Sequence, residues 1–171
     1  MANNVPAFLS KYPEPLKAFR FLVEVDGDTV GAFAQFSGIK MQVQTIQARS
    51  GSDGRGVQET VPVLTTFSPV TLTKGVIGNN AFLDWIFAAS ASTHAGPTGT
   101  RLYRTINVIA LDDAGNRGVI WSMADAMPIG YELSPMDSSR SEVLTESVTF
   151  AIHGVERTVS PLSLLLKSTE G

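Results

Sequence analysis

Apolar and polar residues alternate along much of this chain, and the segment from Ser141 to His153 is the most informative example. Successive side chains of a β strand point to opposite faces. One face of this segment would carry two carboxylates among large apolar side chains: Glu142, Leu144, Glu146, Val148, Phe150 and Ile152. The other face would carry small or nearly uncharged side chains: Val143, Thr145, Ser147, Thr149, Ala151 and His153. An outer face without Lys, Arg or Glu is atypical of a solvated strand, so we predict that this strand meets other chains.

Shorter alternating segments predict an opening hairpin. Phe19 to Val25 alternates and stops at Asp26-Gly27-Asp28, a sequence typical of a tight turn between two strands. Thr29 to Phe36 is predicted to be the returning strand, which Ser37-Gly38 ends. The N-terminal part of the chain is therefore predicted to pair with itself as antiparallel strands.

A long hairpin is predicted next. Ile39 to Arg49 alternates between an apolar face and a polar one. The polar face carries Lys40, Gln42 and Gln44. The glycine-rich sequence SGSDGRG at residues 50–56 is typical of a loop, and Val57 to Thr66 can return as the second strand. Residues 45–66 are therefore predicted to project from the domain as a hairpin.

One amphipathic helix is predicted from Ala81 to Ala89. The strand-like segment from Pro69 to Gly75 precedes it, and Asn79-Asn80 offers side-chain oxygens that can cap a helix N-terminus. The apolar residues at helical spacing are Phe82, Trp85, Ile86 and Ala89. We predict that this face docks on the sheets, with Phe82, Trp85 and Ile86 in the core.

The second half of the chain continues the β pattern. Leu102 to Leu111 and Arg117 to Met123 flank the turn-forming sequence DDAGN, and Ala126 to Tyr131 extends the pattern. The tail from Thr158 is rich in leucine and is compatible with either a short helix or a strand. The whole pattern predicts a mainly β, mostly antiparallel sandwich or barrel with one flanking helix.

Length and composition favour a single domain without covalent cross-links. The chain has 171 residues, and a domain of this size buries about 70% of its unfolded surface. There are no cysteines, which excludes disulfides, thiolate zinc sites and thiol nucleophiles. We expect one domain over residues 1–171, with an N-terminal arm at 1–17 and a C-terminal tail at 158–171.

Charge narrows the possible functions. The net charge is −3, which argues against a surface that neutralises nucleic-acid phosphates. Only 17% of the residues are charged, below the usual quarter, and a weakly charged surface is typical of a protein largely covered by partners. No apolar segment has the length of a signal peptide core or of a membrane span. We therefore expect cytoplasmic synthesis without a membrane anchor.

Residues with catalytic or ligand-binding chemistry form no coherent group. His94 and His153 are the two histidines, and neither has a second metal ligand at a suitable spacing. The sequence DDAGN at 112–116 resembles a calcium loop, but a turn is the preferred interpretation because the longer acidic spacing of an EF-hand is missing. The loop at 50–56 lacks the Gly-Lys-Ser/Thr of a phosphate-binding loop. We expect neither a metal nor a cofactor.

Two alternatives remain open from the residues alone. Glu142 and Glu146 could be the acid and base of a hydrolase. The preferred interpretation pairs them instead with basic side chains, the candidates being Lys74, Arg101, Arg140 and Arg157. Trp121 could stack on sugars in a carbohydrate-binding β sandwich, although both it and Trp85 are predicted to lie in the core.

Several segments, in this order, resemble the tail tube proteins of contractile phages and related injection systems. Phe19 to Gly27 and Gly31 to Ile39 are similar to the family's opening hairpin and its FxxxSGL-type turn. Val70 to Val76 and the helical Leu83-Asp84-Trp85-Ile86 are similar to its TLKRG strand and LxxWI helix. The closing match comprises Ala126-Met127-Pro128 and the segment from Ser141 to Gly154. Together they cover most of the chain.

The resemblance implies a structural subunit rather than an enzyme. Such subunits form hexameric rings that stack into a rigid, hollow inner tube. The implied partners are further copies of the chain, a contractile sheath around the tube, baseplate and tube-terminating proteins, and a cargo of effector protein or DNA in the lumen. The tube would be driven through a target envelope when the sheath shortens, as part of a phage, a secretion apparatus or a released injection particle.

The resemblance also assigns surfaces. The expected lumen-facing residues are Lys40, Gln42, Gln44, Thr145, Ser147 and Thr149. The expected contacts between subunits or rings are Arg49, Ser52, Asp53, Arg55, Glu142 and Glu146. The chain departs from the family at Gln47 to Gly51, where a YREGG-like stretch is common, and at Val61-Pro62-Val63, which replaces LPG. We expect Glu146→Lys to impair ring assembly more than folding.

Overall fold

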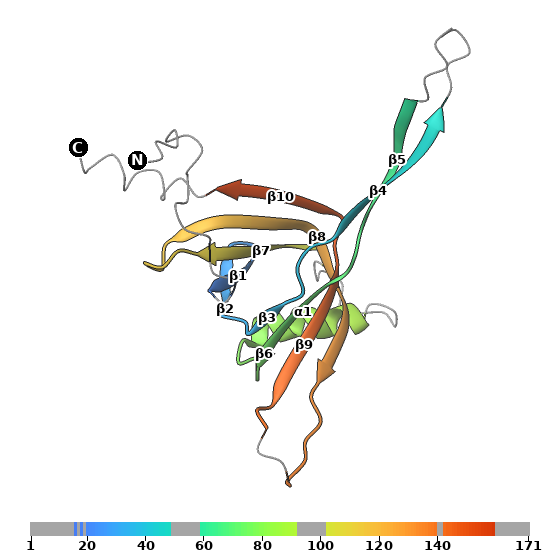
Figure 1. The fold of residues 1–171 in the computed structure, drawn as a ribbon. Coiled ribbons are helices and arrows are strands. Elements are labelled where there is room, and N and C mark those ends of the chain that lie inside the picture. The colour runs from blue at the N-terminus through green and yellow to red at the C-terminus, as the bar shows by residue number, and fades with distance from the viewer. Residues whose placement is uncertain are drawn as a thin grey trace, which may run out of the picture.

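Antiparallel strands dominate the chain, as Figure 1 shows. The computed structural model describes residues 16, 18, 20–48, 59–91, 102–139 and 142–159. Its strands are β1 (Phe21–Val25), β2 (Asp28–Gly31), β3 (Gln35–Phe36), β4 (Met41–Ala48), β5 (Glu59–Phe67), β6 (Val70–Gly75), β7 (Arg104–Leu111), β8 (Arg117–Leu133), β9 (Thr145–Ala151) and β10 (Gly154–Val159). The helix is α1 (Asn80–Ala91). The mainly β prediction with one flanking helix is confirmed.

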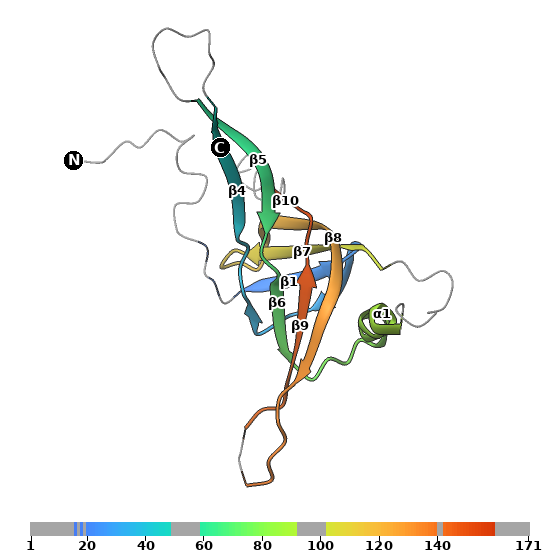
Figure 2. The same cartoon turned by 90° about the vertical axis from the view of Figure 1, so that its right-hand side faces the viewer.

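Eight of the described strands form one strongly bent sheet. Their order is β2-β1-β7-β8-β9-β6-β3, with β10 also paired to β8, and every neighbouring pair is antiparallel. The sheet has two halves, and the long strand β8 belongs to both. Its first part pairs with β7 and β10 in one half, while Met127 to Leu133 pairs with β9 in the other. The strands of the two halves therefore cross one another (Figures 1 and 2).

The bend in β8 lies at Asp125, which has a φ of 50°. Such a left-handed backbone is uncommon outside glycine and needs support from its surroundings. His153 supplies it: its Nδ1 lies 3.0 Å from the Asp125 carbonyl oxygen, and its backbone N–H donates to the Ala124 carbonyl at 3.3 Å. Because a carbonyl only accepts, the Nδ1 atom must carry the proton. His153 thus stabilises the bend between the two halves of the sheet.

The core lies where α1 packs against the bent sheet (Figure 2). The Asn79 side chain accepts a hydrogen bond from the Phe82 N–H at 3.1 Å, so it caps the helix as predicted. Phe82, Trp85 and Ile86 are all buried, which confirms the predicted core face. The Trp85 ring stacks on Phe150 of β9 with their centroids 5.5 Å apart. Helix and sheet therefore share one aromatic cluster.

The strand predicted from Ser141 to His153 is shorter in the structure and runs from Thr145 to Ala151 as β9. The predicted assignment of faces is confirmed within it, since Glu146, Val148 and Phe150 are buried while the residues between them are half-buried. Its first residue is set by its neighbours: Gly75, the last residue of β6, pairs with Thr145, and Leu133 at the end of β8 pairs with Glu146. No described strand remains for the preceding residues to pair with.

The predicted returning strand from Thr29 to Phe36 is interrupted and forms two strands, β2 and β3. β2 pairs with β1, as expected for a hairpin. After Gly31, which has a φ of 130°, the chain crosses to the other half of the sheet, where β3 pairs with β6. The glycine permits this departure because a residue with a Cβ rarely adopts such a backbone conformation.

The long hairpin projects from the body, as predicted, and forms a separate two-stranded sheet (Figures 1 and 2). Pairing runs from Met41 opposite Phe67 to Ala48 opposite Glu59, so it begins nearer the body than the predicted range of 45–66. The loop at 50–56 lies outside the described residues, as do His94 and the tail beyond Val159. No helix within the described ranges is both long and apolar enough to cross a membrane.

The two tryptophans differ in how deeply they are buried. Trp85 is 1% exposed and lies in the core as predicted. Trp121 was predicted to be core as well, but it is half-buried and lines an open groove. Alternation along β8 correctly places Trp121 on the inner face of its strand, opposite Val108 of β7. The prediction of full burial was wrong because α1 covers only part of that face.

Candidate assembly surfaces

A row of paired hydroxyl groups covers one face of β6 and β9. Thr71 lies opposite Thr149, and Thr73 lies opposite Ser147. Their hydroxyl oxygens are 3.0 Å apart in the first pair and 2.8 Å apart in the second. Such cross-strand hydroxyl pairs stabilise a sheet modestly, by about 0.2–1 kcal/mol each. We call Thr71, Thr73, Ser147 and Thr149 the hydroxyl face.

The hydroxyl face lies on the side of these strands opposite to the buried Leu72, Val148 and Phe150. Along β8, the residue directly opposite Ser147 is Glu132, the one charged residue that the described register adds to this face from that strand. Small hydroxyl groups offer weak, reversible hydrogen bonds and little apolar contact. The surface therefore offers little to hold a charged or apolar molecule.

The lumen residues expected from the sequence include Ser147 and Thr149, the β9 half of this surface, together with the neighbouring Thr145. Their partners Thr71 and Thr73 were missed, although the alternation of Val70 and Leu72 with the two threonines was a sufficient signal. The other expected lumen residues, Gln42 and Gln44, are exposed on the hairpin, and Lys40 directly precedes it. The structure therefore brings the β9 residues together with β6, and places the glutamines on a different sheet.

Glu146 lies among neutral partners. One carboxylate oxygen accepts a hydrogen bond from the Ile77 N–H at 2.5 Å and the other from the Tyr131 hydroxyl at 2.9 Å. Lys74 lies directly opposite Glu146 in the strand register. Among the described residues these two bonds take the place of a pairing with a basic side chain within the chain, while Arg101 and Arg140 lie outside the described residues. Glu146 thereby ties the start of the helical segment to β9.

Glu142 lies outside β9 and is exposed. It therefore does not share a strand face with Glu146. The hydrolase considered above would require its acid and base to lie on one face. The other expected contact residues, Arg49, Ser52, Asp53 and Arg55, lie outside the described residues.

The Glu146–Tyr131 contact makes a measurable pH prediction. Burial, and then the hydrogen bond and negative charge of Glu146, raise the pKa of Tyr131 above its ordinary value of 10.0. Its stabilising contribution is therefore complete below pH 10.0 and is lost as the pH rises through the folded-state pKa. We expect Glu146→Gln to lower this pKa toward 10.0, because the glutamine carries no charge. Ultraviolet titration measures the pKa of Tyr131. The Tyr131→Phe variant identifies which of the three tyrosine signals belongs to this residue. An unchanged titration would contradict the assigned contact.

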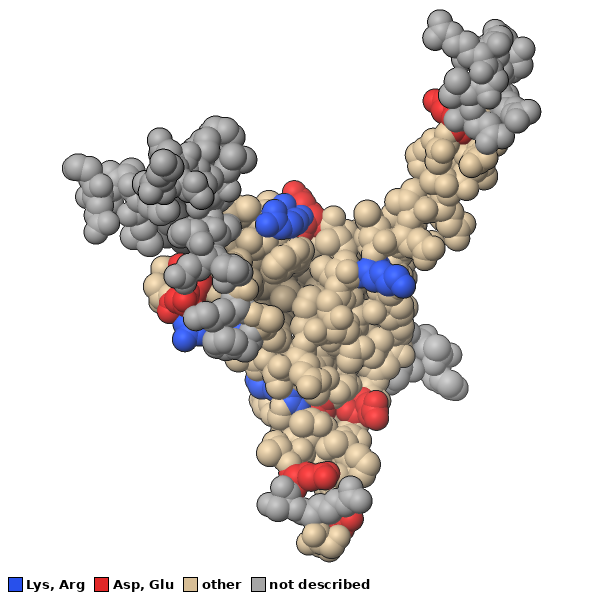
Figure 3. Space-filling view, viewed as in Figure 1, with Lys and Arg blue, Asp and Glu red and all other residues tan. Residues whose placement is uncertain are grey.

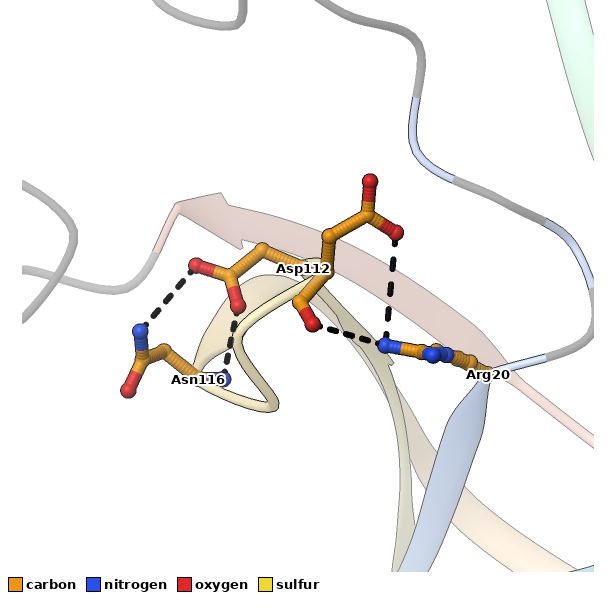
Figure 4. A network of polar contacts seen from close by, with 4 residues as sticks. Arg20, Asp112 and Asn116 are labelled. Carbon is orange, nitrogen blue, oxygen red and sulfur yellow. Dashed lines mark hydrogen bonds and ion pairs between the residues drawn. The ribbon is translucent and has the colours of Figure 1, made fainter.

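The DDAGN sequence forms a turn between β7 and β8, as predicted (Figure 4). Asp112 accepts hydrogen bonds from the Asn116 backbone N–H at 2.8 Å and from its side-chain amide at 3.2 Å. The first of these bonds is the main reason why the pKa of Asp112 is lowered. Arg20 donates to the neighbouring Asp113 carbonyl at 2.8 Å. No group of three or more possible metal ligands occurs among the described side chains.

Sequence comparison identifies the family. The model of the family "T4-like virus tail tube protein gp19" matches residues 17–156. The chain belongs to this tail tube protein family. The match spans the opening hairpin, the projecting hairpin, the helix and β9, which confirms the resemblance drawn from the separate motifs. No curated protein sequence matches the chain.

Solved structures share the fold of this tail tube protein. A chain of the extended sheath-tube complex of PVC, an extracellular contractile injection system, is 22% identical with a TM-score of 0.69, covering 91% of this chain and 99% of that one. The tube terminating cap of the anti-feeding prophage is 25% identical with a TM-score of 0.68, covering 86% and 93%. A type six secretion system protein is 14% identical with a TM-score of 0.50, covering 82% and 83%.

These findings support a tail tube subunit and not a carbohydrate-binding module. Members of the family are structural components of tail-like particles. The surfaces described above are therefore best considered as parts of a repeating assembly.

Proposed function

We propose that this tail tube protein forms hexameric rings that stack into a hollow tube, with the hydroxyl face lining the lumen. The observation that carries the proposal is the pairing of Thr71 with Thr149 and Thr73 with Ser147 on the face opposite to α1. A lumen wall must let cargo slide, and this face offers hydroxyls instead of charges or large apolar groups. The helix would then lie on the outer side, toward a sheath.

The edges of the sheet support closure into a ring. The section β8-β9-β6-β3 has four antiparallel strands, so its two edge strands run in opposite directions. Placing the β8 edge of one copy beside the β3 edge of the next continues the antiparallel pattern. Repeating this step around an axis removes both free edges of this section, and free edges otherwise promote uncontrolled pairing.

The proposed partners follow from the assemblies in which similar folds occur. Their sources include a sheath-tube complex, a tube terminating cap and a baseplate. We propose corresponding partners for this chain, with effector protein or DNA passing through the lumen. The particle would be assembled after synthesis in the cytoplasm. The expected contacts at Glu142 and in the loop at 49–55 belong to the same proposal.

Electron microscopy of the purified protein at high concentration tests the assembly. We expect rings with sixfold averages and, at higher concentration, stacked tubes. The lumen assignment is tested with Thr149→Cys, the single thiol in a chain without cysteine. A bulky maleimide should label this thiol readily in disassembled protein and only slowly within tubes. Monodisperse monomers at every concentration would overturn the assembly, and equal labelling in both states would overturn the lumen assignment.

A further inference from the structure

A groove of about 800 Å³ opens beside the hydroxyl face. One wall is the part of the sheet that α1 leaves uncovered, with Phe21, Val108, Ala110 and Trp121. The other wall is the segment at residues 34–39, which includes β3. An open groove that is mostly apolar is costly to leave in water and typically marks an interaction site.

The groove offers almost no charge to a ligand. Among the described residues that line it, Arg20 is the one with a charged side chain. Its guanidinium donates to the Asp113 carbonyl at 2.8 Å and is therefore held at the turn between β7 and β8. Charged side chains are also sparse over the described body in Figure 3. The groove is therefore suited to an uncharged apolar segment.

The C-terminal tail contains a segment of this kind. Four of the five residues from Leu162 to Leu166 are leucines, and we call these five residues the leucine segment. The tail lies outside the described residues, and the match to the tail tube family ends before it, at residue 156. The proposed tube gives these leucines no role. Leucine side chains left in water cost free energy, so the leucine segment needs a cover of its own.

The end of β10 lies on the same face of the sheet as the groove. Val159, the last residue of β10, pairs with Val119 of β8. In the same row across the sheet, Val119 pairs with Ala110, and Ala110 pairs with Phe21. Directly paired residues share a face, so Val159 points to the side on which Ala110 and Phe21 line the groove. Neighbouring strands are about 4.8 Å apart, which places the Phe21 strand about 14 Å from β10.

The tail is long enough to cover the groove of its own chain. Leu162 follows Val159 by three residues, and Leu166 follows it by seven. An extended chain spans about 3.3 Å per residue, so these leucines can reach about 10 Å and about 23 Å from Val159. Pro161 has no backbone N–H with which to extend the pairing of β10. The chain can therefore leave the strand just before the first leucine.

We propose that the leucine segment packs into the groove of its own chain, against the wall with Ala110 and Trp121. The N-terminal arm is a poorer occupant, because Lys11, Pro13 and Glu14 separate its apolar residues from the groove. The tail would cover an apolar surface that otherwise promotes uncontrolled association of free subunits. Since the contact uses the wall opposite β3, the β3 edge stays available for the proposed ring closure.

Photocrosslinking at Leu165 tests the proposal. This residue is replaced with benzoylphenylalanine, and equal amounts of dilute, unassembled ¹⁴N and ¹⁵N protein are mixed and irradiated. Mass spectrometry then shows which peptide the probe reaches and whether the crosslink joins one chain or two. We expect intrachain crosslinks to peptides with residue 21 or residues 108–121. The same probe at Phe87, which is exposed on α1, is the control and should not reach these peptides.

The outcomes separate this packing from the proposed function. Interchain crosslinks to the groove, crosslinks only to another surface, or none at all would overturn the packing. Because the crosslinking uses unassembled subunits, its result does not depend on rings. Failure of the unsubstituted protein to form rings or tubes at high concentration would overturn the proposed function and leave the packing intact.

Replacing the leucines provides a second test. Leu164→Ser, Leu165→Ser and Leu166→Ser together should lower the thermal unfolding midpoint of the subunit by about 5 °C or more, because buried apolar groups are lost. Ser163→Ala together with Ser168→Ala is the matched control, since it changes the same tail and keeps every leucine. The control should unfold at the midpoint of the unsubstituted subunit. An equal midpoint for the leucine variant would overturn the proposal.

Tryptophan fluorescence reports on the groove directly. Trp121 lines the groove, whereas Trp85 lies in the core. The leucine variant should therefore shift the emission to longer wavelength and make it easier to quench with acrylamide. In a Trp121→Phe background, which leaves the Trp85 signal alone, the same leucine replacements should not change the emission. An unshifted spectrum with Trp121 present would also overturn the proposal.

Discussion

Trp85→Ala is expected to lower the free energy of unfolding by about 3–5 kcal/mol, the usual loss for a buried tryptophan. Trp85 is 1% exposed and stacks on Phe150, and its indole N–H donates to the Leu102 carbonyl at 2.8 Å. The substitution leaves a cavity between the helix and the sheet, and it leaves that partly buried carbonyl without its donor. Since natural domains are stable by only about 5–15 kcal/mol, much of the protein should be unfolded.

Urea unfolding of unassembled protein, followed by circular dichroism, measures this effect. Phe87→Ala is the matched control, because Phe87 lies on the same helix with half of its surface exposed. It removes an edge-to-face ring contact with Tyr131, whose centroid lies 5.2 Å away, and should cost about 1–2 kcal/mol, well below the loss for Trp85→Ala. Comparable losses for the two variants would contradict the placement of α1 on the sheet.

Glu146→Lys is expected to destabilise the monomer by about 3–5 kcal/mol, because it leaves two hydrogen-bond donors without their acceptor and buries an unpaired charge. The substitution removes the acceptor of the Ile77 N–H and of the Tyr131 hydroxyl. It also places an ammonium group in a buried position opposite Lys74. The structure therefore changes the expectation from sequence, in which assembly suffered more than folding: we now expect folding itself to fail.

Separate measurements of monomer stability and of assembly distinguish these two expectations. Glu142→Lys is the control, since Glu142 is exposed and lies outside β9. It should shift the unfolding midpoint far less than Glu146→Lys does, and its main defect should appear in assembly. A Glu146→Lys monomer of normal stability that fails to form rings would restore the original expectation.

Local sequence patterns predicted the elements well where the neighbouring strands did not interfere. Asn79 caps α1, the turn at Asp112 forms, and the buried and half-buried residues of β9 alternate as expected. The errors lie at positions where distant segments decide. β9 begins only where β6 and β8 provide partners, and the chain changes partner after Gly31. Strand length depends on pairing, which no local pattern contains.

For the candidate surfaces, too, local patterns predicted one part and distant segments decided the rest. Alternation alone placed Ser147 and Thr149 on a small, uncharged face. It could not show that Thr71 and Thr73 complete the surface, because that depends on a register between strands more than seventy residues apart in the chain. Trp121 was placed on the correct side of its strand, but its exposure depends on how far the helix extends over the sheet.

The sequence by itself determined the family, the strand and helix types, and the side chains that share a face, because these follow from local periodicity and ordered motifs. Only the tertiary structure decided what each face meets. It assigned Glu146 to the Ile77 N–H and the Tyr131 hydroxyl, paired the hydroxyls of β6 and β9, and left an apolar groove beside them. The physical reason is that hydrogen bonds and burial depend on which distant segments become neighbours, and the crossing of the two halves of the sheet sets those neighbours.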